Sequence, residues 1–249
     1  MSNFANFGKQ SSYYSKGRRE YPDTVFLYLK TLLQDKDPIL DIGCGTGIST
    51  RQLARHGFED VQGVDKDSKM LEEAQENKEF KHILYFQAQA SKMPFRMGQF
   101  KAITCFSSFH WFSDSLSINE MKRVLKKAGY IFIVQKQDRV PFGGYIKDRI
   151  TEKTGLTFPE VQPPLDAKPI LEKLSFEIIA TKTFPGEDIY TLPDAVDYMR
   201  STSFFPAIPE KDQQSVIDKI IKPALEEKMK WERIAREYDA ITLVARKKN

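Results

Sequence analysis

The stretch PILDIGCGTGIST, residues 38–50, places three glycines within five residues, directly behind an apolar pair and an aspartate. An apolar run such as PILDIG predicts a buried strand, and STRQLARHG, residues 49–57, predicts a helix that Gly57 closes. Each glycine adds to the conformational entropy that folding must overcome. The usual return is a tight turn whose backbone comes close enough to touch a ligand. The stretch therefore predicts a strand–turn–helix unit with a ligand site at its turn.

Short apolar runs and helix-like segments alternate through the first half of the chain. We expect strands at 38–43, 60–65, 83–90, 100–109 and 130–135. We expect helices at 49–57, at 68–77 with Ser68 as its cap, and at 115–129 with Gly129 at its end. This alternation predicts a parallel sheet with helices on both of its faces.

The pattern loosens after residue 135. Residues 136–164 contain PFGGY and FPEVQPP and are predicted to be loop. The remaining elements are expected to be a helix at 167–175, a strand at 176–184, a helical and irregular segment at 185–237, and a strand at 240–246. Two late strands that flank a long insertion predict an antiparallel pair. The expected fold class is therefore α/β, with seven strands that are mostly parallel and a last strand that is antiparallel.

The composition is that of an ordinary globular protein of 249 residues, 41% hydrophobic and 29% charged. The net charge of +4 permits an anionic partner but demands neither nucleic acid nor a membrane. No apolar run is long enough to span a bilayer, and the first residues lack the apolar region of a signal peptide. The two cysteines, Cys44 and Cys105, do not suggest a disulfide, so we expect a cytoplasmic protein with no membrane partner.

The residues around the turn narrow the choice of ligand class. The glycines follow the spacing G-x-G-x-G, and Ile48 stands where a dinucleotide site needs its third glycine. Asp41 would sit poorly beside a pyrophosphate but suits a cationic ligand. Asp65, at the end of the second strand, can accept hydrogen bonds from both hydroxyls of a ribose. A ribose together with cationic groups is the profile of S-adenosylmethionine (SAM).

These residues resemble the class I SAM-dependent methyltransferases, from about Tyr14 to Gln135. ILDIGCGTG resembles their first motif and VQGVDKDSKML their second, while QASKMPF resembles the segment around the adenine. MKRVLKKAGYIFIV is similar to the helix and strand that carry their fifth strand. YSKGRREYP (14–22) and FHW (109–111) resemble the small-molecule branch that includes trans-aconitate methyltransferases. The resemblance implies a Rossmann-like fold and a single methyltransferase domain over 1–249.

The resemblance also implies a cofactor site, with SAM as the cofactor and S-adenosylhomocysteine as its product. Asp41 would anchor the methionine ammonium, Asp65 the ribose, and Ala90 the adenine through its N–H. Arg18 would approach the methionine carboxylate from the N-terminal arm, and Gln89 stands where the family has an aspartate. The implied set is Tyr14, Arg18, Asp41, Gly43, Cys44, Gly45, Thr46, Gly47, Asp65, Lys66, Met70, Gln89, Ala90 and Ser107.

The substrate is expected above the carboxyl ends of the strands, where open α/β sheets bind ligands. Its walls would come from a loop-like N-terminal arm (1–20) and from two lid segments (136–164 and 185–237), with Trp111, Arg139 and Arg200 as contacts. Apolar walls with a few cations suit a small organic acid. His110 is either packed at the edge of the sheet or a general base, and we expect no metal.

Three functions stay open from the sequence. The first is O-methylation of a small carboxylate or hydroxyl compound. The second is methylation of a macromolecule, such as a carrier protein or RNA. The third is SAM binding without turnover. SSFHWF follows the fourth strand in place of the Asp/Asn-Pro-Pro-Tyr motif of amino-methylating enzymes, which argues against DNA as the substrate. The oligomeric state is not predicted.

Overall fold

A computed structural model describes residues 11–77, 79–158 and 166–248. The chain divides into two compact units. The sheet unit comprises Glu20–Gln137, Pro164–Pro185 and Asp239–Asn249, and the helical unit comprises Met1–Arg19, Asp138–Pro163 and Gly186–Tyr238. Each unit is described by itself.

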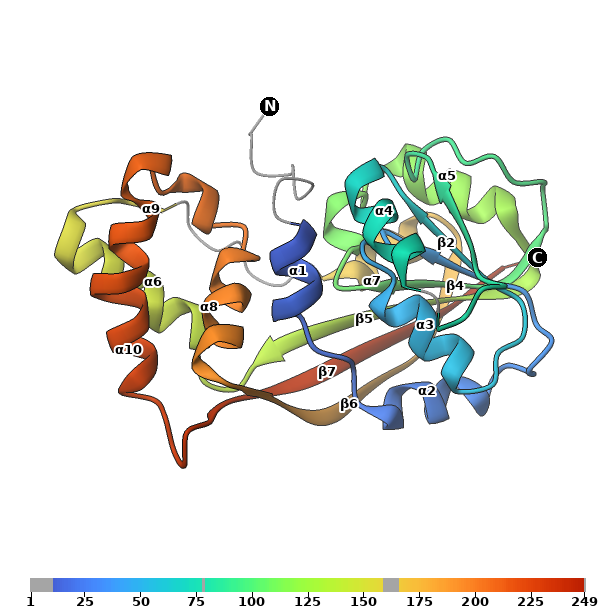
Figure 1. Cartoon of the computed structure of the whole chain (residues 1–249). Coiled ribbons are helices and arrows are strands. Elements are labelled where there is room, and N and C mark those ends of the chain that lie inside the picture. The colour runs from blue at the N-terminus through green and yellow to red at the C-terminus, as the bar shows by residue number, and fades with distance from the viewer. Residues whose placement is uncertain (1–10, 78, 159–165, 249) are drawn as a thin grey trace. The chain divides into compact units, whose positions relative to one another are not determined.

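The strands form one seven-stranded sheet in the order β3-β2-β1-β4-β5-β7-β6 (Figure 1). Their bounds are β1 Ile39–Ile42, β2 Val61–Asp65, β3 Leu84–Gln87, β4 Phe100–Phe106, β5 Leu125–Asp138, β6 Phe176–Tyr190 and β7 Ile234–Lys247. β3, β2, β1, β4 and β5 pair in parallel, and the last strands are antiparallel. The predicted fold class, a Rossmann-like and mostly parallel sheet, is confirmed.

Helices of the sheet unit cover both faces of the sheet. They are α2 Asp23–Lys30, α3 Ile48–Arg55, α4 Ser68–Glu76, the 3₁₀ turn η3 Phe109–Trp111, α5 Ser115–Val124 and α7 Ala167–Lys173. Alternate residues of a strand face opposite sides. Ile103 of β4 packs into a buried core with α5 and α7, whereas Phe106 stacks on Phe26 of α2.

The helical unit has a core of its own. Its elements are α1 Ser11–Gly17, α6 Phe142–Thr154, α8 Leu192–Arg200, the 3₁₀ turn η4 Phe205–Ala207, α9 Glu210–Val216, the π-helix η5 Ile217–Ile221 and α10 Lys222–Glu226. Buried side chains of α6, α8 and η5, among them Ile150, Met199 and Ile221, form one apolar cluster. The bounds of the three segments of the helical unit differ by at most two residues from the bounds predicted for the arm and the two lid segments.

Two predicted boundaries after the fourth strand are wrong. The helix predicted for 115–129 ends at Val124, and the strand predicted for 130–135 is β5, which begins at Leu125. Leu125 pairs with Phe100 of β4 before the register shifts, so pairing across the sheet overrides the helical propensity of KKAG. Gly129 therefore lies in a strand and does not end a helix.

The loop predicted for 136–164 contains a helix. α6 follows Pro141 and is closed by Gly155, which has a φ of 70°. Pro before and Gly after a helix are its ordinary boundary signals. Gly143 and Gly144 lower the helical propensity of this segment, so the helix that buries Ile146 and Ile150 was not predicted.

The helical segment predicted for 185–237 includes strand at both ends, because β6 continues to Tyr190 and β7 starts at Ile234. Along β7, Ile234, Arg236 and Tyr238 are buried, and the two residues between them, Ala235 and Glu237, are exposed. This alternation is typical of a strand. It was not recognised in the sequence, because one of the buried positions is occupied by a charged residue, Arg236.

Two smaller expectations are also corrected. The arm was expected to be loop-like, but residues 11–17 form α1, and Gly17 at its end packs closely on the backbone of Tyr198 in α8. The cap of α4 is Asp67 in place of Ser68, since the Asp67 carboxylate accepts a hydrogen bond from the Lys69 N–H.

Candidate cofactor site

The glycine turn connects β1 to α3 and is fastened to β2. The N–H groups of Gly43 and Cys44 donate to the Val64 carbonyl at 2.8 and 3.1 Å. The Gly45 N–H donates to the Asp65 carboxylate at 2.9 Å. Gly43, Gly45 and Gly47 have φ values of 68, 54 and 77°, a region that side chains with a Cβ rarely adopt. The turn thus depends on its glycines for its conformation.

Close neighbours also exclude larger residues from the turn. A Cβ at Gly43 would lie 2.6 Å from the Ser108 Cβ, and one at Gly47 would lie 2.5 Å from the Tyr85 hydroxyl. A Cβ at Gly45 would meet only the Met70 methyl group, at 3.1 Å. Tight packing against neighbouring side chains is therefore enough to explain why residues 43 and 47 are glycines. Gly45 has fewer protein neighbours and is where a ligand could approach the backbone most closely.

Asp41, on β1, is fully buried and surrounded by hydroxyl groups. Its Oδ2 accepts from Ser49 and Thr50 of α3, both at 2.7 Å, and its Oδ1 accepts from Thr104 of β4 at 2.9 Å. Burial raises the pKa of Asp41 to about 6, although the three hydrogen bonds oppose the shift. The carboxylate therefore ties the start of α3 to two strands.

The three hydroxyl groups around Asp41 were missed in the sequence. Thr104 is the register partner of Asp41 across the β1–β4 pair, and Ser49 and Thr50 lie in the first turn of α3. A polar residue at the centre of each apolar strand was the signal that could have linked Thr104 to Asp41, because buried polar groups need partners.

Asp65 lies at the carboxyl end of β2, where the sequence placed a ribose contact. Its two oxygens accept from the backbone N–H groups of Gly45 and Asp67, at 2.9 and 3.0 Å. Burial raises the pKa of Asp65, and these backbone hydrogen bonds oppose the shift. Each carboxylate oxygen can accept further hydrogen bonds, so the group retains capacity for ligand hydroxyls.

The expected adenine segment lies beside the same strand end. The Ala88 N–H donates to the Asp65 carbonyl at 3.0 Å, and the Gln87 side chain donates to the Lys66 carbonyl at 3.3 Å. Gln89 belongs to a short turn closed by the Lys92 N–H, and Ala90 packs against the buried core of the sheet unit. Met70 is buried against the glycine turn.

The residues after β4 border the turn from the other side. Ser108 packs on Gly43 and donates to the Ile42 carbonyl at 2.7 Å, so its neighbour Ser107 lies at the same edge. Ser107 has a φ of 48°. His110 and Trp111 are exposed, with ring centroids 4.6 Å apart. Partial desolvation lowers the pKa of His110 from its ordinary value, because burial disfavours the charged ring.

The remaining predicted contacts lie in the helical unit. The Arg18 guanidinium donates to the Ser201 hydroxyl and carbonyl, both at 3.0 Å, and lies between the rings of Tyr14 and Tyr198. Arg200 pairs weakly with Asp197, at 3.5 Å, and lies over the Tyr13 ring. Arg139 is exposed, and its N–H donates to the Glu237 carbonyl. Their predicted roles at the ligand stay predictions.

The sheet unit therefore assembles a glycine cradle, a carboxylate and two serines at one end of β1, β2 and β4. The Thr46 hydroxyl in the same turn is buried and has no hydrogen-bond partner among the described residues. An orphaned hydroxyl beside a glycine turn and the Asp65 carboxylate fit a ligand with several polar groups, as SAM has. Within the described ranges, no group of acidic, histidine and cysteine side chains could hold a metal ion.

Known proteins share both the motif region and the fold. The family model described as "Methyltransferase domain" matches residues 40–133, from β1 into β5. An uncharacterized methyltransferase-like protein of Schizosaccharomyces pombe is 25% identical over 227 residues, which cover 84% of this chain and 83% of that protein.

Two solved structures are similar in fold. A SAM-dependent methyltransferase from Methanosarcina mazei matches with a TM-score of 0.54 and 18% identity, over 92% of this chain and 99% of that one. A phosphoethanolamine N-methyltransferase of Haemonchus contortus, solved with phosphomonomethylethanolamine and S-adenosylhomocysteine, matches with a TM-score of 0.58 and 14% identity, over 100% of this chain and 61% of that one. No helix within the described ranges has the length and apolar character needed to cross a bilayer.

Proposed function

We propose that this chain, which belongs to the class I SAM-dependent methyltransferases, methylates an oxygen atom of a small molecule, in the first place a carboxylate. Its cofactor is SAM, which becomes S-adenosylhomocysteine. The observation that carries the proposal is the segment after β4. Its only acidic residue, Asp114, is occupied in capping α5. His110 is therefore the only ordinary base there, and a carboxylate acceptor needs none.

The cofactor supplies a methyl group that is already activated by its positive sulfur. In the proposed reaction, an acceptor carboxylate oxygen forms the new O–C bond while the S–C bond breaks, and its electron pair stays on sulfur. No proton moves, so the protein has to align the two reactants and exclude water, which lowers a barrier by about 7–11 kcal/mol in favourable cases. With a hydroxyl acceptor, His110 would take the proton.

We assign Asp65 to the ribose, and the glycine turn to the close approach of the cofactor. The hydrogen bonds of Asp41 to Ser49 and Thr50 support a part in holding the turn. A contact of Asp41 with the methionine ammonium, directly or through water, stays a prediction. We also retain the proposal that the chain is one domain in which the arm and the two lid segments enclose the substrate.

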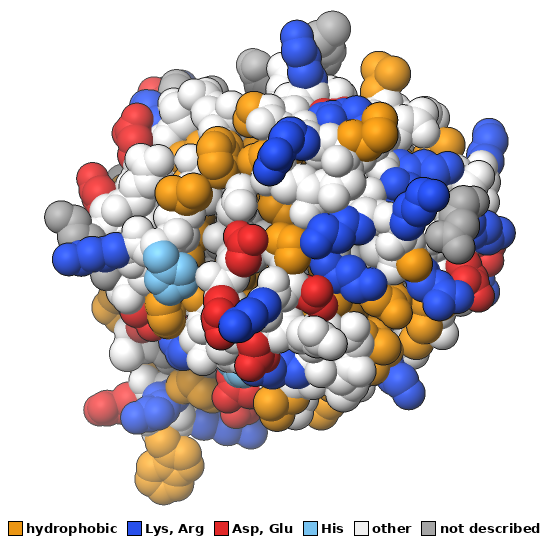
Figure 2. All heavy atoms as spheres, turned by 90° about the vertical axis from the view of Figure 1, so that its right-hand side faces the viewer, with side chains coloured by type: hydrophobic (Ala, Val, Ile, Leu, Met, Phe, Trp, Pro, Cys, Tyr) orange, Lys and Arg blue, Asp and Glu red, His pale blue; other side chains and the backbone are white. Residues whose placement is uncertain are grey.

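The alternatives are methylation of a macromolecule and SAM binding without turnover. Figure 2 shows acidic, basic and apolar side chains interspersed over the face it presents, whereas an RNA surface is typically a continuous basic one. The face drawn there therefore gives no support to the RNA alternative, and DNA is not proposed as a partner. Buried free thiols at Cys44 and Cys105 support the proposal of a cytoplasmic location.

The test is turnover of methyl-labelled SAM with a library of organic acids and phenols, after calorimetry has established that S-adenosylhomocysteine binds. We expect base-labile methyl esters from at least one acid. Asp65→Ala should weaken S-adenosylhomocysteine binding by a few kcal/mol at most, because the ribose hydroxyls lose their acceptor. Cofactor binding without product from any acid or phenol would contradict the proposal and favour a binding protein. A salt-sensitive complex with RNA would favour the macromolecular alternative.

A further inference from the structure

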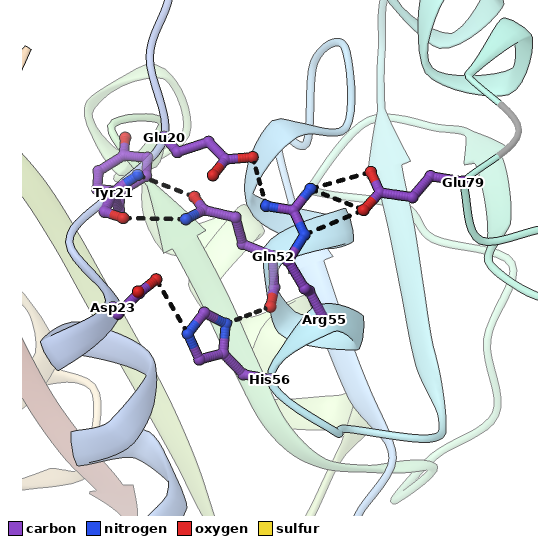
Figure 3. Close-up of polar contacts among 7 residues, drawn as sticks. All are labelled: Glu20, Tyr21, Asp23, Gln52, Arg55, His56 and Glu79. Carbon is purple, nitrogen blue, oxygen red and sulfur yellow. Dashed lines mark hydrogen bonds and ion pairs between the residues drawn. The ribbon is translucent and has the colours of Figure 1, made fainter. Parts of the chain in front are cut away.

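Tyr21, the second residue of the sheet unit, is held by α3 through its backbone. Its N–H donates to the Gln52 side-chain oxygen at 2.8 Å, and the Gln52 amide donates back to its carbonyl at 2.9 Å (Figure 3). Gln52 is almost fully buried and belongs to the helix that begins at the glycine turn. The pair resembles one rung of a sheet and fixes the position of the Tyr21 backbone relative to that helix.

Side chains at the end of α3 fasten the same segment at two further points, Glu20 and Asp23. Arg55 pairs with Glu20 at 2.7 Å and with Glu79 at 2.8 Å (Figure 3). His56 contacts Asp23 at 3.1 Å, and its other ring nitrogen faces the Gln52 carbonyl at 2.8 Å. The His56 side chain is only 14% exposed. Residues 20–23 are therefore a fixed strap in the sheet unit.

The Tyr21 side chain reaches the end of β4. Its hydroxyl donates to the Ser107 hydroxyl oxygen at 2.8 Å, and its ring lies 4.8 Å from that of Phe106. Ser107 has a positive φ, and its N–H donates to the Val134 carbonyl at 2.7 Å. A serine held in the left-handed region is strained, and such strain is often kept where it serves a site.

The Ser107 hydroxyl is left with a proton to donate. Its oxygen accepts from Tyr21, and within the described residues its own hydrogen has no acceptor. A hydroxyl that accepts one hydrogen bond donates a stronger one. The Lys136 ammonium lies 5.0 Å from the Tyr21 ring centroid and donates to the Glu20 carbonyl, which puts a positive charge beside Tyr21.

We propose that Tyr21 is a positioning residue, which directs the Ser107 hydroxyl to donate to a carboxylate oxygen at the methionine end of the cofactor. The inference rests on the proposed function. With Asp65 assigned to the ribose, the carboxylate is the part of SAM that both accepts hydrogen bonds and carries negative charge. Tyr21 acts through Ser107 and needs no contact with the cofactor.

The experiment is calorimetry of the full chain with two ligands that differ in the amino-acid part. S-adenosylhomocysteine carries the carboxylate, whereas 5′-methylthioadenosine lacks it. Tyr21→Phe keeps the ring and the Gln52 contacts and removes only the hydroxyl. We expect it to weaken S-adenosylhomocysteine about 3- to 10-fold, the range of one hydrogen bond, and to leave methylthioadenosine unchanged within about twofold.

Ser107→Ala should weaken S-adenosylhomocysteine at least as much, and the double variant no more than Ser107→Ala. Ser107→Gly, which accepts a positive φ, replaces it if the alanine variant does not fold. Tyr28→Phe is the matched control, because Tyr28 lies on α2 in the same unit and packs on Phe184. It should change neither affinity.

Equal weakening of both ligands by Tyr21→Phe would overturn the proposal, because it would show a general structural role. Unchanged affinity for both ligands would overturn it as well. If the wild-type chain bound neither ligand, the proposed function itself would fail, and this result is distinct from either outcome in the variants.

Discussion

Asp41 in the sheet unit and Arg236 in the helical unit are both buried charged groups, but different partners surround them. Among the described residues, the hydrogen-bond donors to Asp41 are the neutral hydroxyl groups of Ser49, Thr50 and Thr104. Arg236 is 6% exposed and pairs with two carboxylates, Asp138 at 2.5 Å and Asp188 at 2.8 Å. It also lies over the rings of Tyr198 and Tyr238.

The two environments treat the charge in opposite ways. Burial raises the pKa of Asp41 to about 6, because three neutral donors do not replace the lost hydration in full. Burial also opposes the charge of Arg236, but Tyr198 and Asp138 more than offset it, and the pKa of Arg236 is raised. Opposite charges thus stabilise the charged form of a buried group, whereas neutral hydroxyl groups stabilise it only in part.

Removing Arg236 should have the largest effect on stability. Arg236→Met removes the cation that pairs with the buried Asp188 and the partly buried Asp138, and we expect the free energy of unfolding to fall by about 3–5 kcal/mol. Urea denaturation at neutral pH measures it. Arg233→Met is the control, since Arg233 is exposed in the preceding turn, and it should change stability by less than about 0.5 kcal/mol. Similar losses in both variants would show that the buried ion pairs do not stabilise the fold.

The titration of Asp41 should be visible as a pH dependence of stability. Its folded pKa of about 6 lies above its ordinary value of 3.8, so the native state holds this proton more tightly. The resulting stabilisation is fully present below about pH 4 and is lost as the pH rises through 6, by about 3 kcal/mol in total. We expect the wild type to lose most of this amount, about 2.4 kcal/mol, relative to Asp41→Asn between pH 4 and 7. Parallel pH curves for the two proteins would rule out the shift.

Deleting one hydroxyl around Asp41 should cost less. Thr104→Val keeps the shape of the side chain and removes the donor to Oδ1, so we expect a loss of about 1–3 kcal/mol at pH 7. Thr242→Val is a matched control, because the Thr242 hydroxyl is buried and has no partner in the described part of the chain. Chemical denaturation should find that control neutral or more stable. A destabilised control would mean that Val does not fit such buried strands.

The smallest effect is expected at the exposed Arg55 cluster. Arg55→Met breaks the pairs with Glu20 and Glu79, and because water and salt screen them, the loss should stay below about 1 kcal/mol. Denaturation at about 0.05 and 0.5 M salt should show the difference from wild type shrinking at the higher concentration. A larger loss that did not depend on salt would contradict this expectation, because it would show that solvent does not screen the Arg55 ion pairs.

The first two strands, the glycine turn and the place of Asp65 at the end of β2 could be predicted because their signals are local. The apolar runs, the positive-φ glycines and the carboxylate at the next strand end all fall within residues 38–65. The boundaries after β4 could not be read in this way. β5 starts at Leu125 because β4 pairs with it there, and residues 142–154 fold into α6 despite two glycines in its first turn.

The sequence by itself determined the class of fold and the residues of the turn, since these depend on backbone conformation and hydrophobic periodicity within short segments. Only the tertiary structure decided which polar groups meet inside. Thr104 reaches Asp41 through strand register, Asp188 reaches Arg236 across 48 residues, and Tyr21 reaches Ser107 across 86. Such contacts depend on how distant segments close on one another, because the desolvation cost of a polar group is repaid only when its partner arrives.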